Sequence, residues 1–364
     1  MNPVTPYHNP TRRSILGAGL WASLGWLAPA GTSRADPAPP RIPKNLFGNL
    51  PYSFGTRIKR EPAFGEPMNF LPHCAKIGFA GAQMSLGKIS IDQAEQLRAA
   101  AETRGLFIEG ILSPPREETD VARFDAELAV IKAAGGSVAR LAMLGGRRYE
   151  QLHSLEEYGQ FTDRAGRQFQ WMEPPARKHG VRLAIENHKD YRSDELAAVM
   201  RRLGSEFVGV CLDFGNNIAL LEDPWKVIDT LAPYALTSHL KDMAVEESAE
   251  GFTLAEVPLG QGVLDLPRII ARIHAANPAA RFNLEMITRD PLRIPCLTDG
   301  YWSTFGAVPS RLDIDRMLGD VKKNARPAGS LPRLSRMTPA EQIEHEHRNV
   351  VQSVAHAQQH LFTQ

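Results

Sequence analysis

Short apolar runs alternate with longer amphipathic segments over most of the chain. Runs rich in Val, Ile and Leu predict strands, whereas segments with an apolar residue every three or four positions predict helices. The predicted strands are residues 50–55, 81–86, 106–112, 138–144, 181–186, 207–213, 235–241 and 281–286. The predicted helices between them are residues 69–76, 91–103, 120–134, 156–179, 193–203, 224–231 and 266–276. Three of these helices stop at a glycine that can end a helix: Gly105, Gly135 and Gly180.

Eight strands that alternate with helices indicate a parallel sheet, and eight is the number that closes into a (β/α)8 TIM barrel. The predicted catalytic domain, residues 50–306, is close to the roughly 250 residues that such a barrel needs. The competing fold is an open doubly wound sheet, but no G-x-G-x-x-G follows the first predicted strand. We therefore predict an α/β protein built on a TIM barrel.

The chain after the barrel, residues 307–364, has a different pattern and predicts a C-terminal extension. Residues Thr338-Pro339-Ala340-Glu341 form a capping box with proline at the first helical position, which opens a helix to about Leu361. Its apolar residues are expected to dock on the barrel or on a neighbouring subunit. Several histidines lie on this helix without a carboxylate or cysteine at matching spacing, which favours a solvated helix face over a metal site.

The N-terminal 35 residues have the features of an export signal. Arg12-Arg13 precede an apolar stretch that runs to about Ala30, and Ser33-Arg34-Ala35 places small residues at a cleavage site. The arginine pair is typical of a twin-arginine signal, which predicts export of the folded protein to the periplasm or another extracytoplasmic space. The alternative is an N-terminal membrane anchor, but the apolar run is short and rich in glycine. No later segment is apolar enough to span a membrane, and the Pro-rich residues 36–49 predict a linker.

Composition narrows the function classes. The 42 basic and 41 acidic residues give a net charge of +1, so the chain lacks the basic excess of a nucleic-acid-binding protein. Three scattered cysteines are too few for a disulfide framework.

Charged or ligating residues recur near the ends of the last four predicted strands. Because barrel residues alternate between the interior and the helix layer, the parity of each strand can be followed to its end. Glu186, Asp213, His239 and Glu285 then point toward one volume above the barrel, where TIM barrels place their chemistry.

Three crowded carboxylates repel one another and need a cation to remain ionised together. Three oxygen ligands and one imidazole favour Mn²⁺, Mg²⁺ or Co²⁺ over ions that prefer thiolates. We therefore predict one divalent metal ion as the cofactor. Taken singly, each of these side chains could instead be a salt-bridged or capping residue.

Five segments carry a resemblance to a known family. They are Leu-Ala-Ile-Glu186-Asn-His, Cys-Leu-Asp213-Phe-Gly-Asn, Ser-His239-Leu-Lys-Asp, Pro-Leu-Gly-Gln-Gly-Val-Leu-Asp265 and Asn-Leu-Glu285-Met. Together they resemble the xylose isomerase-like TIM-barrel superfamily of sugar isomerases and epimerases, over about residues 50–290. The resemblance implies that Glu186, Asp213, His239 and Glu285 are the metal ligands, and that Glu186 and Glu285 form the acid/base pair. Ketose 3-epimerases of this superfamily usually carry Asp-x-x-His after the sixth strand, whereas this chain has Asn216 at the fourth position.

Four further residues are candidates for binding substrate: His188, Asn216, Lys241 and Arg289. His188 lies in the loop after the fifth strand, Lys241 shares the parity of His239, and Arg289 follows the eighth strand, where barrels often bind anions. His188, Lys241 and Arg289 could each equally be structural, with Lys241 paired to Asp242 or Glu109 and Arg289 to Asp290. Other pocket residues without an assigned role are expected near Arg57, His73, Gln83, Glu109 and Met143.

Such a site acidifies the C–H next to a substrate carbonyl and stabilises the enediolate that forms, which supports isomerisation or epimerisation. The same electron sink would serve decarboxylation or retro-aldol cleavage. Residues 283–302 resemble a subgroup associated with 3-oxo-isoapionate decarboxylase, which implies a sugar-acid substrate. The sequence thus predicts a sugar isomerase or epimerase, with a decarboxylase or lyase as the alternative and a non-enzymatic sugar-binding barrel as the third reading. The predicted partner is a small carbohydrate or sugar acid, and the sequence is compatible with a homo-oligomer.

Overall fold

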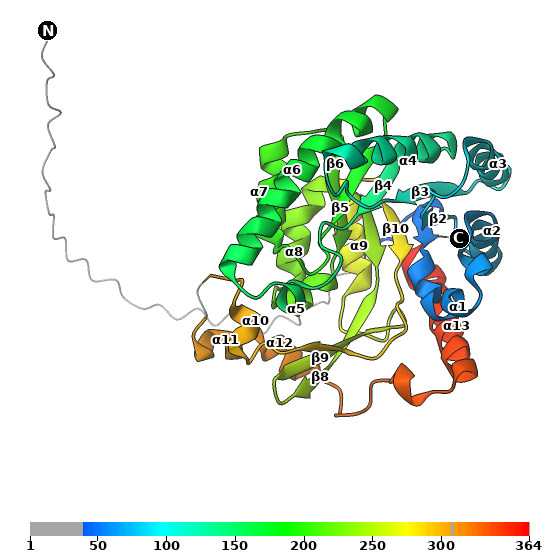
Figure 1. The fold of residues 1–364 in the computed structure, drawn as a ribbon. Coiled ribbons are helices and arrows are strands. Elements are labelled where there is room, and N and C mark those ends of the chain that lie inside the picture. Colours follow the sequence, from blue (N-terminus) through cyan, green and yellow to red (C-terminus); the bar gives the residue numbers. More distant parts are fainter. Residues whose placement is uncertain (1–38, 307–308, 364) are drawn as a thin grey trace, which may run out of the picture. The chain divides into compact units, whose positions relative to one another are not determined.

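Eight parallel strands close into a barrel (Figure 1). Strands β1 to β7 pair in chain order, and β10 closes the ring between β7 and β1. The computed structural model describes residues 39–306 and 309–363. The predicted export signal and the start of the predicted linker lie outside these residues. The predicted TIM barrel is confirmed. Its strands are β1 (Phe47–Asn49), β2 (Gly81–Met84), β3 (Phe107–Ile111), β4 (Val138–Leu141), β5 (Arg182–Glu186), β6 (Val208–Asp213), β7 (Ala235–Leu240) and β10 (Arg281–Leu284).

Helices surround the barrel, and their positions follow the sequence prediction closely. Gly105, Gly135 and Gly180 all have positive φ, at 62°, 82° and 64°, as expected for residues that end helices. The helices are α1 (Gly55–Arg60), α2 (Pro67–Ile77), α3 (Ile91–Glu102), α4 (Val121–Ala133), α5 (Arg148–Gln151), α6 (Leu155–His179), α7 (Ser193–Leu203), α8 (Pro224–Leu231), α9 (Leu266–Ala276), α10 (Asp299–Trp302), α11 (Arg311–Met317), α12 (Gly319–Asn324) and α13 (Pro339–His356).

The first strand lies earlier than predicted. The expected strand at residues 50–55 is wrong, because Pro51 starts a 3-10 helix, Pro51–Phe54, that continues into α1. Proline cannot donate a ladder hydrogen bond, which disfavours it inside a strand. The barrel therefore begins with Phe47, inside the stretch predicted as a linker.

A three-stranded antiparallel sheet covers one side of the barrel mouth and was not predicted. The strands β8 (Asp242–Ser248) and β9 (Gly251–Val257) form a hairpin, and β11 (Leu292–Ile294) pairs with β9. Several glutamates interrupt the apolar pattern of the hairpin, so it lacks the alternation that marks a strand. The sheet builds a second apolar core with α10, α11 and α12.

The C-terminal helix α13 packs on the barrel. Val350, Val354 and Leu361 belong to the main apolar core, and Phe362 forms an isolated bridge with Ile42. The predicted capping box is present: the Thr338 side chain accepts the backbone N–H of Glu341, and the Glu341 side chain accepts the backbone N–H of Thr338. None of the described helices is long and apolar enough to cross a membrane.

The α1 helix receives its N-terminal cap from α13. The buried carboxylate of Glu346 accepts hydrogen bonds from the backbone N–H groups of Thr56 and Arg57, at 2.6 and 3.0 Å. Because the first N–H groups of a helix have no partner within the helix, this one side chain joins the C-terminal extension to the start of the barrel.

Strand parity is as predicted. Ala184 and Cys211 belong with Val138 to a separate small apolar cluster inside the barrel, whereas Leu183, Ile185 and Val210 belong to the main core between strands and helices. The interior is also polar, because Gln83, Glu109, Arg140, Thr237 and Asn283 are all buried there or at its rim. A polar interior provides the hydrogen bonds that fix the site above it.

Candidate active site

The four predicted ligands lie together at the C-terminal ends of four adjacent strands. Glu186 ends β5, Asp213 ends β6, His239 lies in β7 and Glu285 follows β10. All four side chains are buried, and one potential ligand atom from each lies within 4.8 Å of the others. His239 Nδ1 is 3.6 Å from Glu186 Oε1, 3.9 Å from Asp213 Oδ2 and 3.5 Å from Glu285 Oε2. The sequence prediction that these residues converge is therefore correct.

The imidazole of His239 is held with Nδ1 toward the carboxylates. Its Nε2 lies 2.9 Å from Gln83 Oε1, and Gln83 Nε2 donates to Glu109 Oε2 at 3.0 Å. Since the Gln83 amide group is oriented by Glu109, its oxygen faces the imidazole and Nε2–H is the donor. Nδ1 then keeps its lone pair, and it has no hydrogen-bond partner in residues 39–306 and 309–363. A buried, unpartnered imidazole nitrogen among three carboxylates fits a divalent cation.

Glu109 anchors this arrangement from inside the barrel. Besides Gln83, its Oε2 accepts hydrogen bonds from Thr237 Oγ1 and Asn283 Nδ2, each at 2.9 Å. Glu109 is 1% exposed, and three donors on one oxygen satisfy a charge that would otherwise be costly to bury. The network therefore stabilises the orientation of His239.

Two buried cations neutralise the carboxylates. Lys241 Nζ contacts Glu285 Oε2 and lies 2.6 Å from Asp213 Oδ2, while Arg140 forms an ion pair with Glu186. Lys241 thus pairs with two predicted metal ligands, and not with Asp242 or Glu109.

The cations set the protonation of the three carboxylates. Burial favours the neutral acid of Glu285, but the positive charge of Lys241 outweighs it and holds the pKa of Glu285 well below its usual range. Arg140 acts in the same way on Glu186, against burial, and lowers its pKa. For Asp213 burial prevails over Lys241 and raises the pKa to about 6. Two of the three carboxylates are thus held ionised by the chain itself.

Asn216 connects the carboxylates to a second lysine. Its Nδ2 donates to Glu186 Oε1 at 3.0 Å and to the backbone oxygen of Asn187 at 3.2 Å. Its Oδ1 accepts a hydrogen bond from Lys189 and a longer one, 3.4 Å, from Lys241. The residue at the position where ketose 3-epimerases carry histidine therefore orients one predicted acid/base residue.

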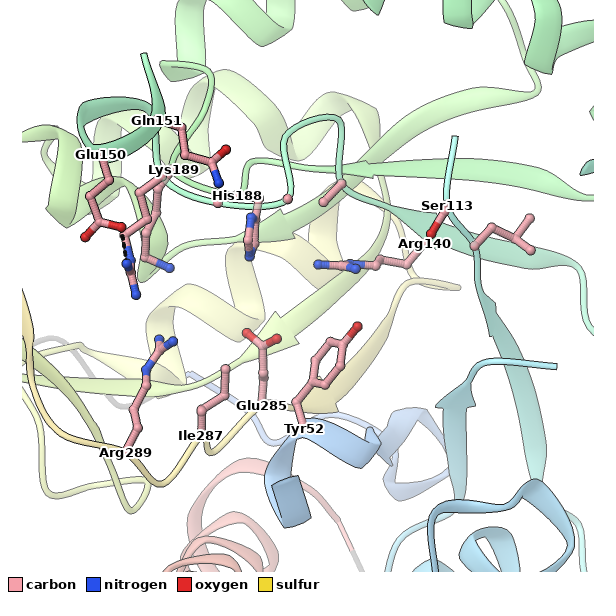
Figure 2. A pocket seen from close by; sticks show the side chains of 15 residues that line it. Tyr52, Ser113, Arg140, Glu150, Gln151, His188, Lys189, Glu285, Ile287 and Arg289 are labelled. Carbon is pink, nitrogen blue, oxygen red and sulfur yellow. Dashed lines mark hydrogen bonds and ion pairs between the residues drawn. The ribbon is translucent and has the colours of Figure 1, made fainter. Parts of the chain in front are cut away.

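A cavity of about 540 Å³ opens beside this cluster (Figure 2). Glu285 lies on its wall, whereas Glu186 is completely covered and is not one of its lining residues. Tyr52, Arg140, His188 and Glu285 point into the same space in Figure 2. The lining residues are Tyr52, Leu112, Ser113, Arg140, Ala142, Gly145, Gly146, Arg147, Glu150, Gln151, His188, Lys189, Glu285, Ile287 and Arg289.

Two predicted substrate-binding residues line this cavity. His188 Nδ1 lies 3.2 Å from the backbone oxygen of Leu144, and burial lowers the pKa of His188 to about 4. Arg289 pairs with buried Glu256 on β9, at 3.2 Å through Nε, and not with Asp290. The unpredicted hairpin therefore determines the position of Arg289.

Of the residues named without a role, Gln83 and Glu109 orient His239, whereas Arg57 and His73 pack against Phe64 away from the cavity. Arg140 and Lys189 belong to the site but were not predicted from the sequence. Arg140 was detectable, since a charged residue inside a predicted buried strand needs a buried partner.

The sequence matches a known family. Residues 71–299, more than half of the chain, match the family described as xylose isomerase-like TIM barrel. The chain belongs to this family. The resemblance drawn from the five sequence segments is thereby confirmed.

Individual relatives differ in what they share with the chain. A stretch of 94 residues is 34% identical to 3-oxo-isoapionate decarboxylase of Pectobacterium atrosepticum and covers 25% of this chain and 34% of that enzyme. The chain thus aligns with only about a third of that relative's length. A crystal structure of D-psicose 3-epimerase, in the presence of D-fructose, superposes with a TM-score of 0.53 at 15% identity, over 87% of this chain and 99% of that one. The 3-keto-D-glucoside 4-epimerase YcjR of E. coli gives 0.52 at 13% identity, over 76% and 99%. Identities this low show the fold alone.

Proposed function

We propose that the protein is a divalent-metal-dependent isomerase or epimerase of a small sugar or sugar acid. The observation that carries this proposal is the buried set of three carboxylates around an imidazole nitrogen that has no hydrogen-bond partner in the part of the chain that the structure describes. Oxygen and imidazole donors suit Mn²⁺, Mg²⁺ or Co²⁺. Membership of the xylose isomerase-like family supports the same class of reaction.

Glu186, Asp213, His239 and Glu285 would hold the ion. A bound divalent ion would polarise a substrate carbonyl and make the adjacent C–H more acidic. The chain's own groups would then move the proton. Glu285 borders the cavity and is kept ionised by Lys241, so its carboxylate is placed to remove a proton from a substrate carbon.

Glu186 would act as the second member of the acid/base pair. Arg140 and Asn216 fix both of its oxygens, so its position is set before a substrate enters. Glu186 does not line the cavity and lies beside His239. Glu186 would therefore exchange a proton only with a part of the substrate that reaches the buried end of the site. His188 and Arg289, which line the cavity, would bind the substrate's oxygens. Asn216 and Lys241 lie outside the lining and would act through the carboxylates that they contact.

The second candidate is a decarboxylase or lyase that acts on a 3-oxo sugar acid. The 94-residue match to 3-oxo-isoapionate decarboxylase favours it, as does the basic lining of the cavity. Both candidates need the same ion and differ in which bond breaks. Assays of CO₂ release and of isomer formation, on a panel of ketoses and oxo-sugar acids, separate them.

Two measurements test the shared mechanism. Metal analysis of the purified protein is expected to find about one divalent ion per chain, and a metal-free wild type that still turns over substrate would refute the proposal. Glu285→Gln is expected to abolish solvent-deuterium exchange into the substrate while the fold persists. Glu250→Gln, at an exposed site on the β8–β9 turn, is the matched control and is expected to exchange normally.

We also propose that the protein is exported by its N-terminal twin-arginine signal. Replacing Arg12-Arg13 by two lysines tests this proposal. Mature protein is expected to stay in the cytoplasm of the variant, and unchanged export would contradict the proposal.

A further inference from the structure

Lys189 occupies an unusual place in the loop after β5. Its φ of 66° puts a residue other than glycine in the left-handed region, a conformation that persists only where neighbours enforce it. Asp190 Oδ1 accepts the backbone N–H groups of His188 and Tyr191, at 3.0 and 2.8 Å. The backbone oxygen of Lys189 accepts the N–H of Arg148 at 3.0 Å. The loop is therefore built to hold the Lys189 side chain in one direction.

That direction is into the cavity, where Lys189 differs from the other cations. Arg140, Arg147 and Arg289 each form an ion pair, with Glu186, Glu150 and Glu256 respectively. Lys189 has no carboxylate within 4.0 Å among the described residues, and its ammonium donates to the neutral Asn216. Yet Lys189 is only 4% exposed. An ammonium buried without a counter-charge is costly, which points to a function for the charge.

We propose that Lys189 binds a carboxylate of the substrate, and hence that the substrate is a sugar acid. This inference rests on the proposed function and narrows its substrate class. Lys189 and Arg289 both line the cavity whose wall also includes Glu285 (Figure 2). The three arginines that line the cavity already pair with carboxylates of the chain, so Lys189 is the one lining cation that has no such pair within the described residues. A single free positive charge matches a singly charged carboxylate better than a doubly charged phosphate ester.

The test compares sugar acids with alditols of the same hydroxyl pattern. Calorimetry in the presence of Mn²⁺ would use D-erythronate with erythritol, D-xylonate with xylitol, and D-gluconate with D-glucitol, together with D-glucitol 6-phosphate. The wild type is expected to bind at least one acid about tenfold or more tightly than its alditol, since a charged hydrogen bond in a buried site is worth that much. No preference in any pair, or tighter binding of the phosphate ester than of every acid, overturns the inference.

Variants assign the preference to Lys189. In Lys189→Met the ratio of acid to alditol affinity is expected to fall to about one, whereas Lys189→Arg is expected to retain most of it. Arg147→Met removes a cavity cation that already has a partner, and is expected to change the ratio by less than about threefold. A ratio that survives in Lys189→Met overturns the inference.

Two further measurements complete the design. The first uses the wild-type protein alone, so it does not depend on the folding of a variant: mass spectrometry measures the extent of reductive methylation of Lys189 with and without each sugar. The acid is expected to protect Lys189 and the alditol is not, and equal protection by both overturns the inference. Mn²⁺ titration without sugar separates the two proposals. Mn²⁺ binding without acid preference refutes the role of Lys189 alone, whereas acid preference without Mn²⁺ binding refutes the proposed function alone.

Discussion

Gln83 offers a direct test of how the barrel interior controls the proposed metal site. Gln83→Leu removes the oxygen that accepts the proton of His239 Nε2 and leaves Glu109 with one donor fewer. Loss of the group that orients a metal-binding histidine typically costs about 10–100-fold in metal affinity, or about 1.4–2.7 kcal/mol. The missing donor to a buried carboxylate is expected to lower the free energy of unfolding by about 1–3 kcal/mol.

Thr237→Val separates these two effects. Thr237 donates to the same oxygen of Glu109 at 2.9 Å but makes no hydrogen bond to His239. Both variants are expected to lose similar stability in urea unfolding, and only Gln83→Leu is expected to lose Mn²⁺ affinity by calorimetry. Equal loss of affinity in the two variants, or none in Gln83→Leu, would refute the argument that Gln83 fixes the imidazole.

Three other predictions concern the scaffold. Glu346→Ala leaves two helix N–H groups without their cap and is expected to lower the free energy of unfolding, measured by urea titration, by about 2–4 kcal/mol. Glu344→Ala, at an exposed position of the same helix, is the control, and its free energy of unfolding is expected to stay within about 0.5 kcal/mol of the wild-type value. The Asp242 carboxylate accepts the N–H groups of the 260–264 loop, and Asp242→Asn replaces it by an amide with one acceptor fewer. The substitution is expected to lower the free energy of unfolding by about 1–3 kcal/mol and to speed hydrogen exchange in that loop. Unchanged exchange in the loop would argue against the role of Asp242. The hydrogen bonds of Arg123 lower the pKa of Asp120 to about 2. The ionised Asp120 therefore stabilises the folded protein above the ordinary carboxyl pKa, and this stabilisation is lost as pH falls toward 2. The melting-temperature difference between wild type and Asp120→Asn is therefore expected to shrink between pH 5 and pH 3, and a constant difference would contradict this assignment.

Strand periodicity explains how much of the site could be predicted. A side chain in a barrel strand alternates between two faces, so the position of Asp213 follows once Val210 and Leu212 are recognised as outward-facing. The same rule could have placed Arg140, two residues after the inward-facing Val138. Local sequence was therefore sufficient wherever a regular strand carried the residue.

The rest depended on features that local sequence does not encode. The left-handed conformation of Lys189 is enforced by Asp190 and by the backbone of Arg148, which is distant in sequence. The hairpin that holds Arg289 through Glu256 has a pattern too rich in glutamate to be recognised as strands. The start of the barrel was displaced because a short apolar run before Pro51 has too few residues to show a period.

Asn216 brings these observations together. Its amide nitrogen donates to Glu186 while its oxygen accepts from both Lys189 and Lys241. A histidine at this position, as in the 3-epimerase pattern, has only two ring nitrogens and could not make all of these bonds at once. The asparagine and Lys189, which has no carboxylate partner among the described residues, are therefore parts of one arrangement, because the amide that orients the proposed acid/base carboxylate also positions this ammonium. The departure from the epimerase pattern leaves the proposed metal ligands intact and changes the partner of Lys189, which lines the cavity.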